Sequence, residues 1–435
     1  MDDPRRAIAS TDALLGDPRL ADACRRLGRA AVVDVIRHAQ ALCREGRIEP
    51  ERVLDEALRL LPAFATSLRQ VVNATGVVVH TNLGRAPLSD AARSALQLAA
   101  GTTDVELDLE TGRRERRGRA ALDALRAAVP EAEGVHVVNN GAAALALAAA
   151  VLAGGKEIVV ARGEMVEIGD GFRIPELLEA TGARLREVGT ANRVSLADYS
   201  AAIGGDTGFV LKVHPSNFVV TGFTASVPVS ELASLPVPVV ADIGSGLLRR
   251  HARLPDEPDA HSALRAGAAL VTASGDKLLG GPQCGLLLGA ASVVDRLRRH
   301  PLARAYRVDK LTLAALEATL TGPPTPVARA LEADAAELRA RAVALVEALS
   351  GAVDAEVVDT LAAVGGGGAP GVELPSVAVS LPDSFAAPLR LGEPAVMGRV
   401  HQDRLLLDLI AVEPSDDAAL ADAVRHTAKT LDEAG

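Results

Sequence analysis

A lysine among small residues is the part of this sequence best suited to do chemistry. Lys277 lies in TASGDKLLGGPQCG, residues 272–285, after the apolar run AALV and shortly before a pair of glycines. Small flanking residues let a bulky group approach the backbone closely. A lysine amine in a partly dry site has a lowered pKa and can form a Schiff base with an aldehyde. The alternative interpretation is an ordinary, exposed loop lysine. The small flanking residues favour a reactive lysine instead.

Pyridoxal phosphate (PLP) is the cofactor that most often uses such a lysine, and it also needs an acid and a phosphate site. Asp242 ends the run VPVVAD, and a carboxylate there keeps the ring nitrogen protonated, so that the ring can accept electrons. The run NNGAAALALAA begins a helix at Asn140, Gly141 and Ala142. Free N–H groups and the positive dipole end of a helix suit a phosphate. Ser274 adds a hydroxyl group to this predicted phosphate site.

The segment HPSN, residues 214–217, supplies further candidates between these positions. Asn217 is expected to reach the phenolic oxygen of the ring, and His214 belongs to the same predicted set. An Asn-rich helix start, an Asp and a Lys, each after a strand and in this order, favour the aspartate-aminotransferase fold, which is fold type I of the PLP-dependent transferases. The predicted cofactor-binding residues are Lys277, Asp242, Asn140, Gly141, Ala142, Ser274, Asn217 and His214.

Short apolar runs must form the sheet that positions these residues. Most are continuous rather than alternating, which is typical of a largely parallel sheet covered on both faces. Ligands of open α/β sheets bind at the carboxyl ends of the strands. Four of the runs end there in small or polar residues, so these ends are candidate walls of the site. The predicted strands lie in GVHVVNN, KEIVVARG, GFVLKVHPS, VPVVADIGSG, ALVTASGD and GLLLGA.

The pattern of apolar residues along the chain changes twice, and these changes predict three domains. Residues 1–67 have helical periodicity, as in LADACRRLGRAAVVDVIRHAQALC, and form the predicted N-terminal helical domain. Residues 68–310 form the predicted PLP-binding domain, in which strands alternate with helices. Residues 311–435 contain two long helical stretches, then β-like runs and a final helix, which predicts a smaller α+β domain.

Arginines are concentrated near the N-terminus. Residues 1–70 contain 12 Arg and 11 Asp plus Glu, a balance of +1, whereas the whole chain carries −10, so the remainder carries −11. Arginines such as Arg25 and Arg29 lie near a common helical face. Such a face is usually only solvated, and charge by itself is weak support for RNA binding.

Composition excludes several classes of protein. The chain has 435 residues, 49% of them hydrophobic, which is ample for a large core, and its net charge gives no reason to expect general affinity for membranes or nucleic acids. Three cysteines form no disulfide framework, and no Cys and His set has zinc-finger spacing, so no metal site is predicted. No uncharged apolar run reaches about 18 residues, and the N-terminus lacks a signal-peptide core. We therefore expect a cytoplasmic protein without a membrane partner.

Other sequence motifs carry little weight. GGGAPG, residues 366–371, matches the GxGxxG dinucleotide pattern, but no helix follows it, so we interpret it as a flexible turn. The sequence contains no GxxxxGK[ST] phosphate-binding motif and no GxSxG nucleophile elbow.

Long motifs over roughly residues 10–410 resemble one family, the bacterial selenocysteine synthases, which are L-seryl-tRNA(Sec) selenium transferases. Residues 71–88 resemble the opening of the family's catalytic part, and the resemblance is specific because so many long motifs follow in order. These are VVNATGVVVHTNLGRAPL, DLETGRR, VVNNGAAA, RGEMVEIGDGFRIPELL, TGARLREVGTANR, LKVHPSNF, GFTASV, SGDKLLGGPQCG, RHPLARAYRVDKLTLAALEATL and GVELPS.

The resemblance implies roles for individual residues. Lys277 is the Schiff-base lysine, and Asp276 beside it is a catalytic acid–base candidate. Arg85, Arg304 and Arg307 match a selenophosphate site, and guanidinium groups pair bidentately with tetrahedral anions. Ordinary ion pairs are the alternative for these arginines.

The resemblance also implies a reaction and partners. Family members convert seryl-tRNA(Sec) to selenocysteinyl-tRNA(Sec) with selenophosphate, through a PLP-bound aminoacrylyl intermediate. They form rings of dimers, usually homodecamers, and an N-terminal helical domain grips the tRNA.

Two departures from the family pattern leave alternatives open. The family's GSRYSH after DLETGRR is replaced by ERRGRA, in which Arg117 is retained but Arg116 is not, and the family's triple asparagine is NNG, with Gly141. One alternative is a related PLP-dependent lyase or aminotransferase acting on a small amine. Arg399 could clamp the carboxylate of a free amino acid, whereas an aminoacyl ester needs no such clamp. Its role therefore discriminates between this alternative and the family reaction. The other alternative is a tRNA-binding protein that has lost catalysis, which the intact Lys277, Asp276 and Asp242 disfavour.

Overall fold

The structure is a computed structural model that describes residues 8–169 and 171–434. The chain divides into two compact units, Met1–Gln70 and Val71–Gly435, and each has a hydrophobic core of its own. Residues 1–7, 170 and 435, which the predicted domains include, lie outside the described residues.

The first unit is helical, as predicted. Its helices are α1 (Thr11–Leu15), α2 (Pro18–Leu27), α3 (Arg29–Arg44) and α4 (Val53–Leu60), with the 3-10 turn η2 (Pro50–Arg52) before α4. Gly28 has a left-handed φ of 87° and divides the continuous helical pattern of residues 20–43 into α2 and α3. The core of the unit contains Leu20, Ala23, Leu27, Val32, Ile36, Ala39, Val53 and Ala57.

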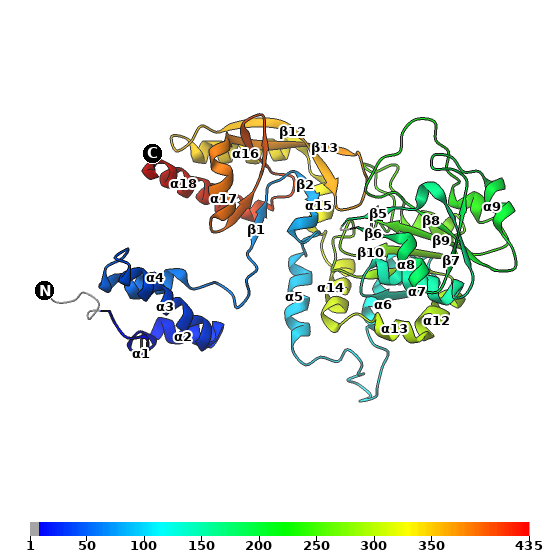
Figure 1. Ribbon diagram of the computed structural model, residues 1–435, viewed down its shortest axis with the longest axis horizontal. Coiled ribbons are helices and arrows are strands. Elements are labelled where there is room, and N and C mark those ends of the chain that lie inside the picture. Colours follow the sequence, from blue (N-terminus) through cyan, green and yellow to red (C-terminus); the bar gives the residue numbers. More distant parts are fainter. Residues whose placement is uncertain (1–7, 170, 435) are drawn as a thin grey trace. The chain divides into compact units, whose positions relative to one another are not determined.

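A seven-stranded sheet forms the centre of the second unit (Figure 1). All six predicted strands are present, and the strands are parallel except β11, which is antiparallel to both of its neighbours. The seventh, β7, lies at the edge of the sheet, and its sequence RLREV is too charged to resemble the buried runs. In order across the sheet, the strands are β3 (Gly134–Val138), β11 (Gly285–Gly289), β10 (Leu270–Ser274), β9 (Val239–Gly244), β8 (Thr207–Val213), β4 (Glu157–Ala161) and β7 (Arg184–Val188).

Helices cover both faces of this sheet, which explains why the predicted strands are continuously apolar. One face packs against α7 (Gly141–Ala153), α8 (Ile174–Ala180), α12 (Ala291–Arg299) and α13 (Pro301–Ala305). The other packs against α6 (Arg119–Ala128), α9 (Leu196–Ala202), α10 (Val229–Leu232), α11 (Ala260–Arg265) and α14 (Lys310–Thr321). Outside these layers lie α5 (Asp90–Ala100), which packs on α14, and a short pair of strands, β5 (Glu167–Ile168) and β6 (Phe172–Arg173).

A second, five-stranded sheet forms the α+β part near the C-terminus. Its strands, in order, are β15 (Arg399–His401), β16 (Arg404–Asp408), β13 (Glu373–Pro382), β12 (Glu356–Gly365) and β2 (Val77–Val79). Around it lie α15 (Pro326–Glu332), α16 (Ala335–Leu349), α17 (Ala386–Leu391) and α18 (Asp417–Ala434), and β1 (Val71–Asn73) pairs with β14 (Ala395–Met397). The 3-10 turns of the second unit are η3 (Thr81–Leu83), η4 (Arg162–Glu164), η5 (Asp383–Phe385) and η6 (Pro414–Asp416).

Two elements cross the predicted boundary between the second and third domains. The strand β2 pairs with β12 although it lies far earlier in the chain, and α14 packs on α5 and α6 of the central part. The boundary at residue 310 therefore stays a prediction. Among the described residues, no helix is long and apolar enough to cross a membrane.

Candidate active site

Lys277 lies just beyond the carboxyl end of β10, in a place where the backbone is closely packed. A Cβ atom at Gly275 would lie 2.4 Å from Cys284 Sγ, and one at Gly367 would lie 3.0 Å from Lys277 Nζ. Burial lowers the pKa of the Lys277 amine, and the carboxylates of Asp242 and Asp276 oppose that shift. A larger fraction of neutral amine makes the lysine a better nucleophile toward an aldehyde.

Asp242 lies at the carboxyl end of β9, on the strand next to Lys277. Thr272 is its register partner on β10, and the Thr272 hydroxyl donates a hydrogen bond of 2.8 Å to Asp242 Oδ1. Burial raises the pKa of Asp242, and the hydrogen bond from Thr272 and the charge of Lys277 oppose this shift. A protonated ring nitrogen beside this carboxylate would offset the cost of its burial.

The residues predicted to bind the phosphate lie together at the N-terminus of α7. Asn140 caps the helix, and its side-chain oxygen accepts a hydrogen bond of 2.8 Å from the amide of Ala143. The amides of Gly141 and Ala142 belong to the first turn, where helices have no internal acceptor. A Cβ atom at Gly141 would lie 2.5 Å from Ser274 Oγ, so the hydroxyl of Ser274 lies directly against this turn. These donors fit a phosphate.

The segment HPSN contributes two residues to the site, and only one of them was predicted. The His214 amide donates to the carbonyl of Asp242 at 3.0 Å, which holds His214 at the end of β9. Asn217 is exposed and donates to the carbonyl of Glu167 at 3.0 Å, so the structure does not bring it to Lys277. Ser216 is buried instead, and its Oγ lies 3.6 Å from a Cβ built at Gly367. The sequence signal that could have identified Ser216 is the HPSN motif, which contains it.

Asp276 and Arg85 form an ion pair beside Lys277. Arg85 Nη1 lies 2.7 Å from Asp276 Oδ2, and Asp276 is 6% exposed. Arg85 has a positive φ of 68°, and the amide of Ala86 donates to the Asp276 carbonyl at 3.2 Å. The two residues are 191 positions apart, so their pairing joins the start of the second unit to the lysine loop.

Arg304 and Arg307 line a different cavity, of about 370 Å³, which Arg85 does not line. Glu106 lies 3.1 Å from Arg117 and 3.9 Å from Arg307. No carboxylate of the described residues lies within 4.0 Å of Arg304, so positive charge predominates here. Burial, together with nearby arginines, lowers the pKa of His136 in this cavity to about 4. The arginines that line the cavity are Arg116, Arg117, Arg298, Arg299, Arg304 and Arg307.

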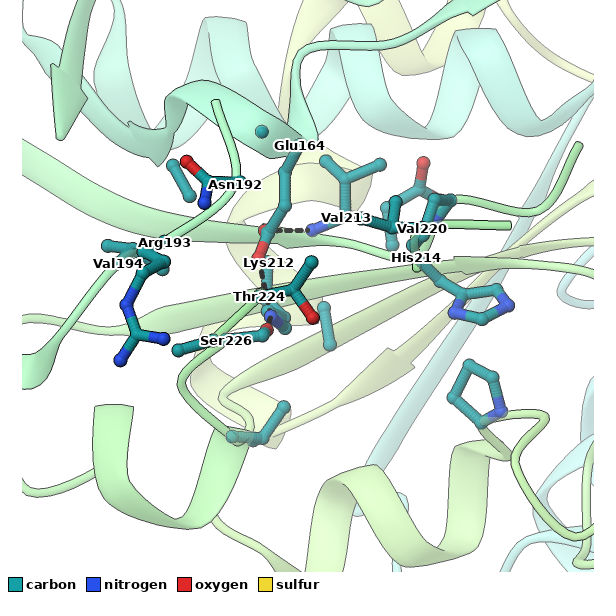
Figure 2. Close-up of a pocket in the computed structure, with 18 of the residues that line it drawn as sticks. Glu164, Asn192, Arg193, Val194, Lys212, Val213, His214, Val220, Thr224 and Ser226 are labelled. Carbon is teal, nitrogen blue, oxygen red and sulfur yellow. Dashed lines mark hydrogen bonds and ion pairs between the residues drawn. The ribbon is translucent and has the colours of Figure 1, made fainter. Parts of the chain in front are cut away.

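A cavity of about 380 Å³ lies beside His214 (Figure 2). Asp242 also lines it. Its wall contains a buried ion pair of Glu164 and Lys212, which the sequence analysis did not predict. Lys212 also donates to Ser226 Oγ at 2.6 Å, and Glu164 accepts from the amide of Val213 at 2.9 Å. Burial raises the pKa of Glu164, and Lys212 opposes this. Lys212 is therefore paired with Glu164 in the wall of this cavity. Lys277, in contrast, lies just beyond the carboxyl end of β10.

Family models match almost the whole chain. The model described as L-seryl-tRNA selenium transferase matches residues 71–413, and the model described as selenocysteine synthase N terminal matches residues 5–44. The chain belongs to the L-seryl-tRNA selenium transferase family. Members from Geobacter sulfurreducens and Hyphomonas neptunium are named L-seryl-tRNA(Sec) selenium transferase. The first is 42% identical over 94% of this chain and 95% of its own length, and the second is 38% identical over 97% and 98%.

A solved structure supports the fold of this selenium transferase family member. D-Glucosaminate-6-phosphate ammonia-lyase aligns with a TM-score of 0.58 and 21% identity, over 83% of this chain and 96% of that one. The predicted aspartate-aminotransferase-like fold, fold type I, is confirmed.

Arg399 lies in the second sheet of this family member. Its guanidinium donates to Thr360 Oγ1 and to the carbonyl of Leu361, and Nη2 lies 3.8 Å from Asp408 Oδ2. Asp408 is fully buried. Arg399 is thus held by groups of β12 and β16.

Proposed function

We propose that this chain converts seryl-tRNA(Sec) to selenocysteinyl-tRNA(Sec), with PLP as cofactor and selenophosphate as selenium donor. The observation that carries the proposal is the pair of neighbouring strand ends that hold Lys277 and Asp242, in a chain that matches the family model over residues 71–413. PLP, when bound, supplies an electron sink for the substrate's α-carbon. Lys277 would hold its aldehyde, Asp242 its ring nitrogen, and the first turn of α7 with Ser274 its phosphate.

Lys277 and the Arg85–Asp276 pair provide the proton chemistry. The amine of Lys277, when free of the cofactor, would take the α-proton of the serine. The ammonium that results would return a proton to the departing β-hydroxyl, which would leave as water. Asp276 lies next to Lys277 in the chain, and its bond to Arg85 keeps one carboxylate oxygen turned toward that guanidinium. General acid–base groups held in this way contribute about 10²- to 10⁴-fold to a rate.

The position of Arg399 favours an esterified substrate over a free amino acid. Its Nη2 donates to Thr360 and Leu361, and the buried Asp408 carboxylate compensates its charge, although Nε has no hydrogen-bond partner among the described residues. Because its charge is already compensated, it is less suited to clamp a free carboxylate, which a related aminotransferase would need. The serine of seryl-tRNA has no such carboxylate. Intact Lys277, Asp276 and Asp242 disfavour a scaffold without catalysis.

The arginine cavity provides the donor site in this proposal. A doubly charged donor next to a phosphate-bearing cofactor needs a concentration of positive charge, because repulsion would otherwise keep it out. Arg304→Ala is expected to lower selenium transfer at subsaturating selenophosphate by about 30- to 5,000-fold, because it removes a charged partner of a desolvated anion. Elimination of water from seryl-tRNA should continue, since that step needs Lys277 and no selenium. Both half-reactions are measured with radiolabelled seryl-tRNA.

Arg184→Ala is the matched control, because Arg184 lies at the start of β7 and pairs with Asp206. Selenium transfer at the wild-type rate by Arg304→Ala would remove Arg304 from the donor site, and loss of elimination as well would assign it to the cofactor or the fold.

Variants of Arg85 and Arg304 also test whether two copies of the chain share a site, as they could in a homo-oligomer, which we propose to be a decamer built of dimers. Arg85 lies apart from Arg304 within one chain, so a second copy would have to supply one of them. Mixing Arg85→Ala with Arg304→Ala protein should then restore part of the transfer, and no restoration would contradict a shared site.

The first unit is the proposed tRNA-binding part. It has its own core, and the selenocysteine synthase N-terminal model matches residues 5–44. Deletion of residues 1–67 is expected to weaken the binding of seryl-tRNA(Sec) by at least about tenfold and to leave the absorbance of bound PLP unchanged. Filter binding and visible spectroscopy measure the two effects. Equal tRNA affinity of the truncated and full chains would contradict the assignment.

A further inference from the structure

The turn between β12 and β13 lies against the reactive lysine. Gly365, which ends β12, and Gly366 and Gly367, which follow it in the turn, have φ values of 73°, 56° and 75°, which residues with a side chain rarely adopt. A Cβ atom at Gly367 would lie 3.0 Å from Lys277 Nζ and 3.5 Å from its Cε. The glycine run that the sequence analysis interpreted as a flexible turn is therefore the backbone cover of Lys277.

Further contacts hold this turn in place. A Cβ atom at Gly368 would lie 3.1 Å from Leu278 Cδ1 and 3.2 Å from Ser245 Cβ, so the turn also packs on the residue after Lys277. Ala369 is buried, and its amide donates a hydrogen bond of 2.6 Å to Glu257 Oε2. Glu257 lies 112 positions earlier, beside the start of α11. The Glu257 carboxylate therefore links the turn of the five-stranded sheet to a loop of the central part of the unit.

The same oxygen of Glu257 also lies next to His214. Glu257 Oε2 is 3.2 Å from His214 Nε2, and the Glu257 side chain is fully buried. Its other oxygen, Oε1, has no hydrogen-bond partner among the described residues. A buried carboxylate is costly unless a donor compensates it. A proton on His214 Nε2 provides that donor, and it fixes which nitrogen of the ring carries hydrogen.

We infer that Glu257 is a positioning residue of the active site, which fixes His214 Nε2 as a donor and holds the glycine turn on Lys277. Gly367 is the point of contact, because only a residue without a side chain leaves the lysine amine in place. Through these contacts, Glu257 determines both how the turn of the five-stranded sheet packs on Lys277 and how the His214 ring is oriented. The inference rests on the proposed function for its catalytic meaning, but capture of PLP by the apoenzyme tests it without tRNA or selenium.

Two substitutions separate the parts of this arrangement. Glu257→Ala removes both hydrogen bonds and is expected to slow PLP capture by about 10- to 100-fold, as for hydrogen bonds to buried charged groups. Glu257→Gln keeps an acceptor for both Ala369 and His214 without the charge, so it is expected to restore most of the capture rate. The preference of the His214 ring for a proton on Nε2 should weaken, because a neutral amide is a weaker acceptor than a carboxylate. The ¹⁵N chemical shifts of His214 report that preference, which a merely structural role of Glu257 would leave unchanged.

Gly367→Ala is expected to slow PLP capture by at least about tenfold, with Gly155→Ala as control. Gly155 also has a left-handed φ, of 73°, but a Cβ atom there meets nothing within 4 Å, so both variants share the backbone strain and only one crowds Lys277. Wild-type capture by Glu257→Ala with an unchanged His214 spectrum, or equal capture by the two glycine variants, would overturn the inference. Failure of the wild-type chain to capture PLP would instead overturn the proposed function. If Glu257→Ala does not fold, Glu257→Gln and Gly367→Ala decide the question.

Discussion

Lys277→Ala is expected to lower selenium transfer by at least about 10³-fold and to abolish covalent attachment of PLP. The lysine has two tasks in the proposed reaction, because it holds the aldehyde and later moves the α-proton, and groups that do either contribute several orders of magnitude. Borohydride reduction followed by mass spectrometry should place the cofactor on Lys277 in the wild-type chain. The same treatment should leave the variant unlabelled.

Lys156→Ala serves as the control, since Lys156 is exposed in the turn before β4. The depressed pKa of Lys277 adds a dependence on pH. Capture needs the neutral amine, so its rate should rise with pH and reach its half-maximum below the ordinary lysine pKa of about 10.4. Labelling of another lysine in the wild-type chain, or a half-maximum at or above that value, would contradict the role given to Lys277.

Asp242→Asn is expected to retain PLP but to lower the rate of elimination from seryl-tRNA by about 10²- to 10⁴-fold. A neutral amide cannot hold the ring nitrogen in its protonated form, so the ring accepts electrons less readily. Loss of one partner of a buried charge pair typically costs about 3–5 kcal/mol, which corresponds to roughly 150- to 5,000-fold. Single-turnover elimination measures the rate, and the visible spectrum shows whether the cofactor is present.

Thr272→Val provides an intermediate case. It removes the 2.8 Å hydrogen bond to Asp242 Oδ1 and leaves the carboxylate in place, so a smaller loss of about tenfold is expected. Asp206→Asn is the control, because Asp206 is exposed in the loop before β8. Elimination at the wild-type rate by Asp242→Asn would show that this carboxylate does not serve the ring nitrogen.

Local patterns in the sequence were sufficient for the sheet and for the centre of the site. The strands β3, β4, β8, β9, β10 and β11 are buried on both faces, so each appears as a continuous apolar run. Parallel strands bring their carboxyl ends to one edge, which explains why Asp242 and Lys277 could be placed together from the sequence. Gly141 and Ser274 could be placed there for the same reason. The edge strand β7 was not predicted, because its exposed residues are charged.

Only the tertiary structure decided how residues far apart in the chain meet. It brought Ser216 rather than Asn217 toward Lys277, since neighbouring residues of a turn point in different directions. It paired Arg85 with Asp276 across 191 positions and Ala369 with Glu257 across 112, and it left Arg304 in another cavity of the same chain. Periodicity and motifs describe the neighbourhood of a residue along the chain. Contacts such as these depend on how the two sheets pack, which is set by the summed burial of many side chains and not by any one motif.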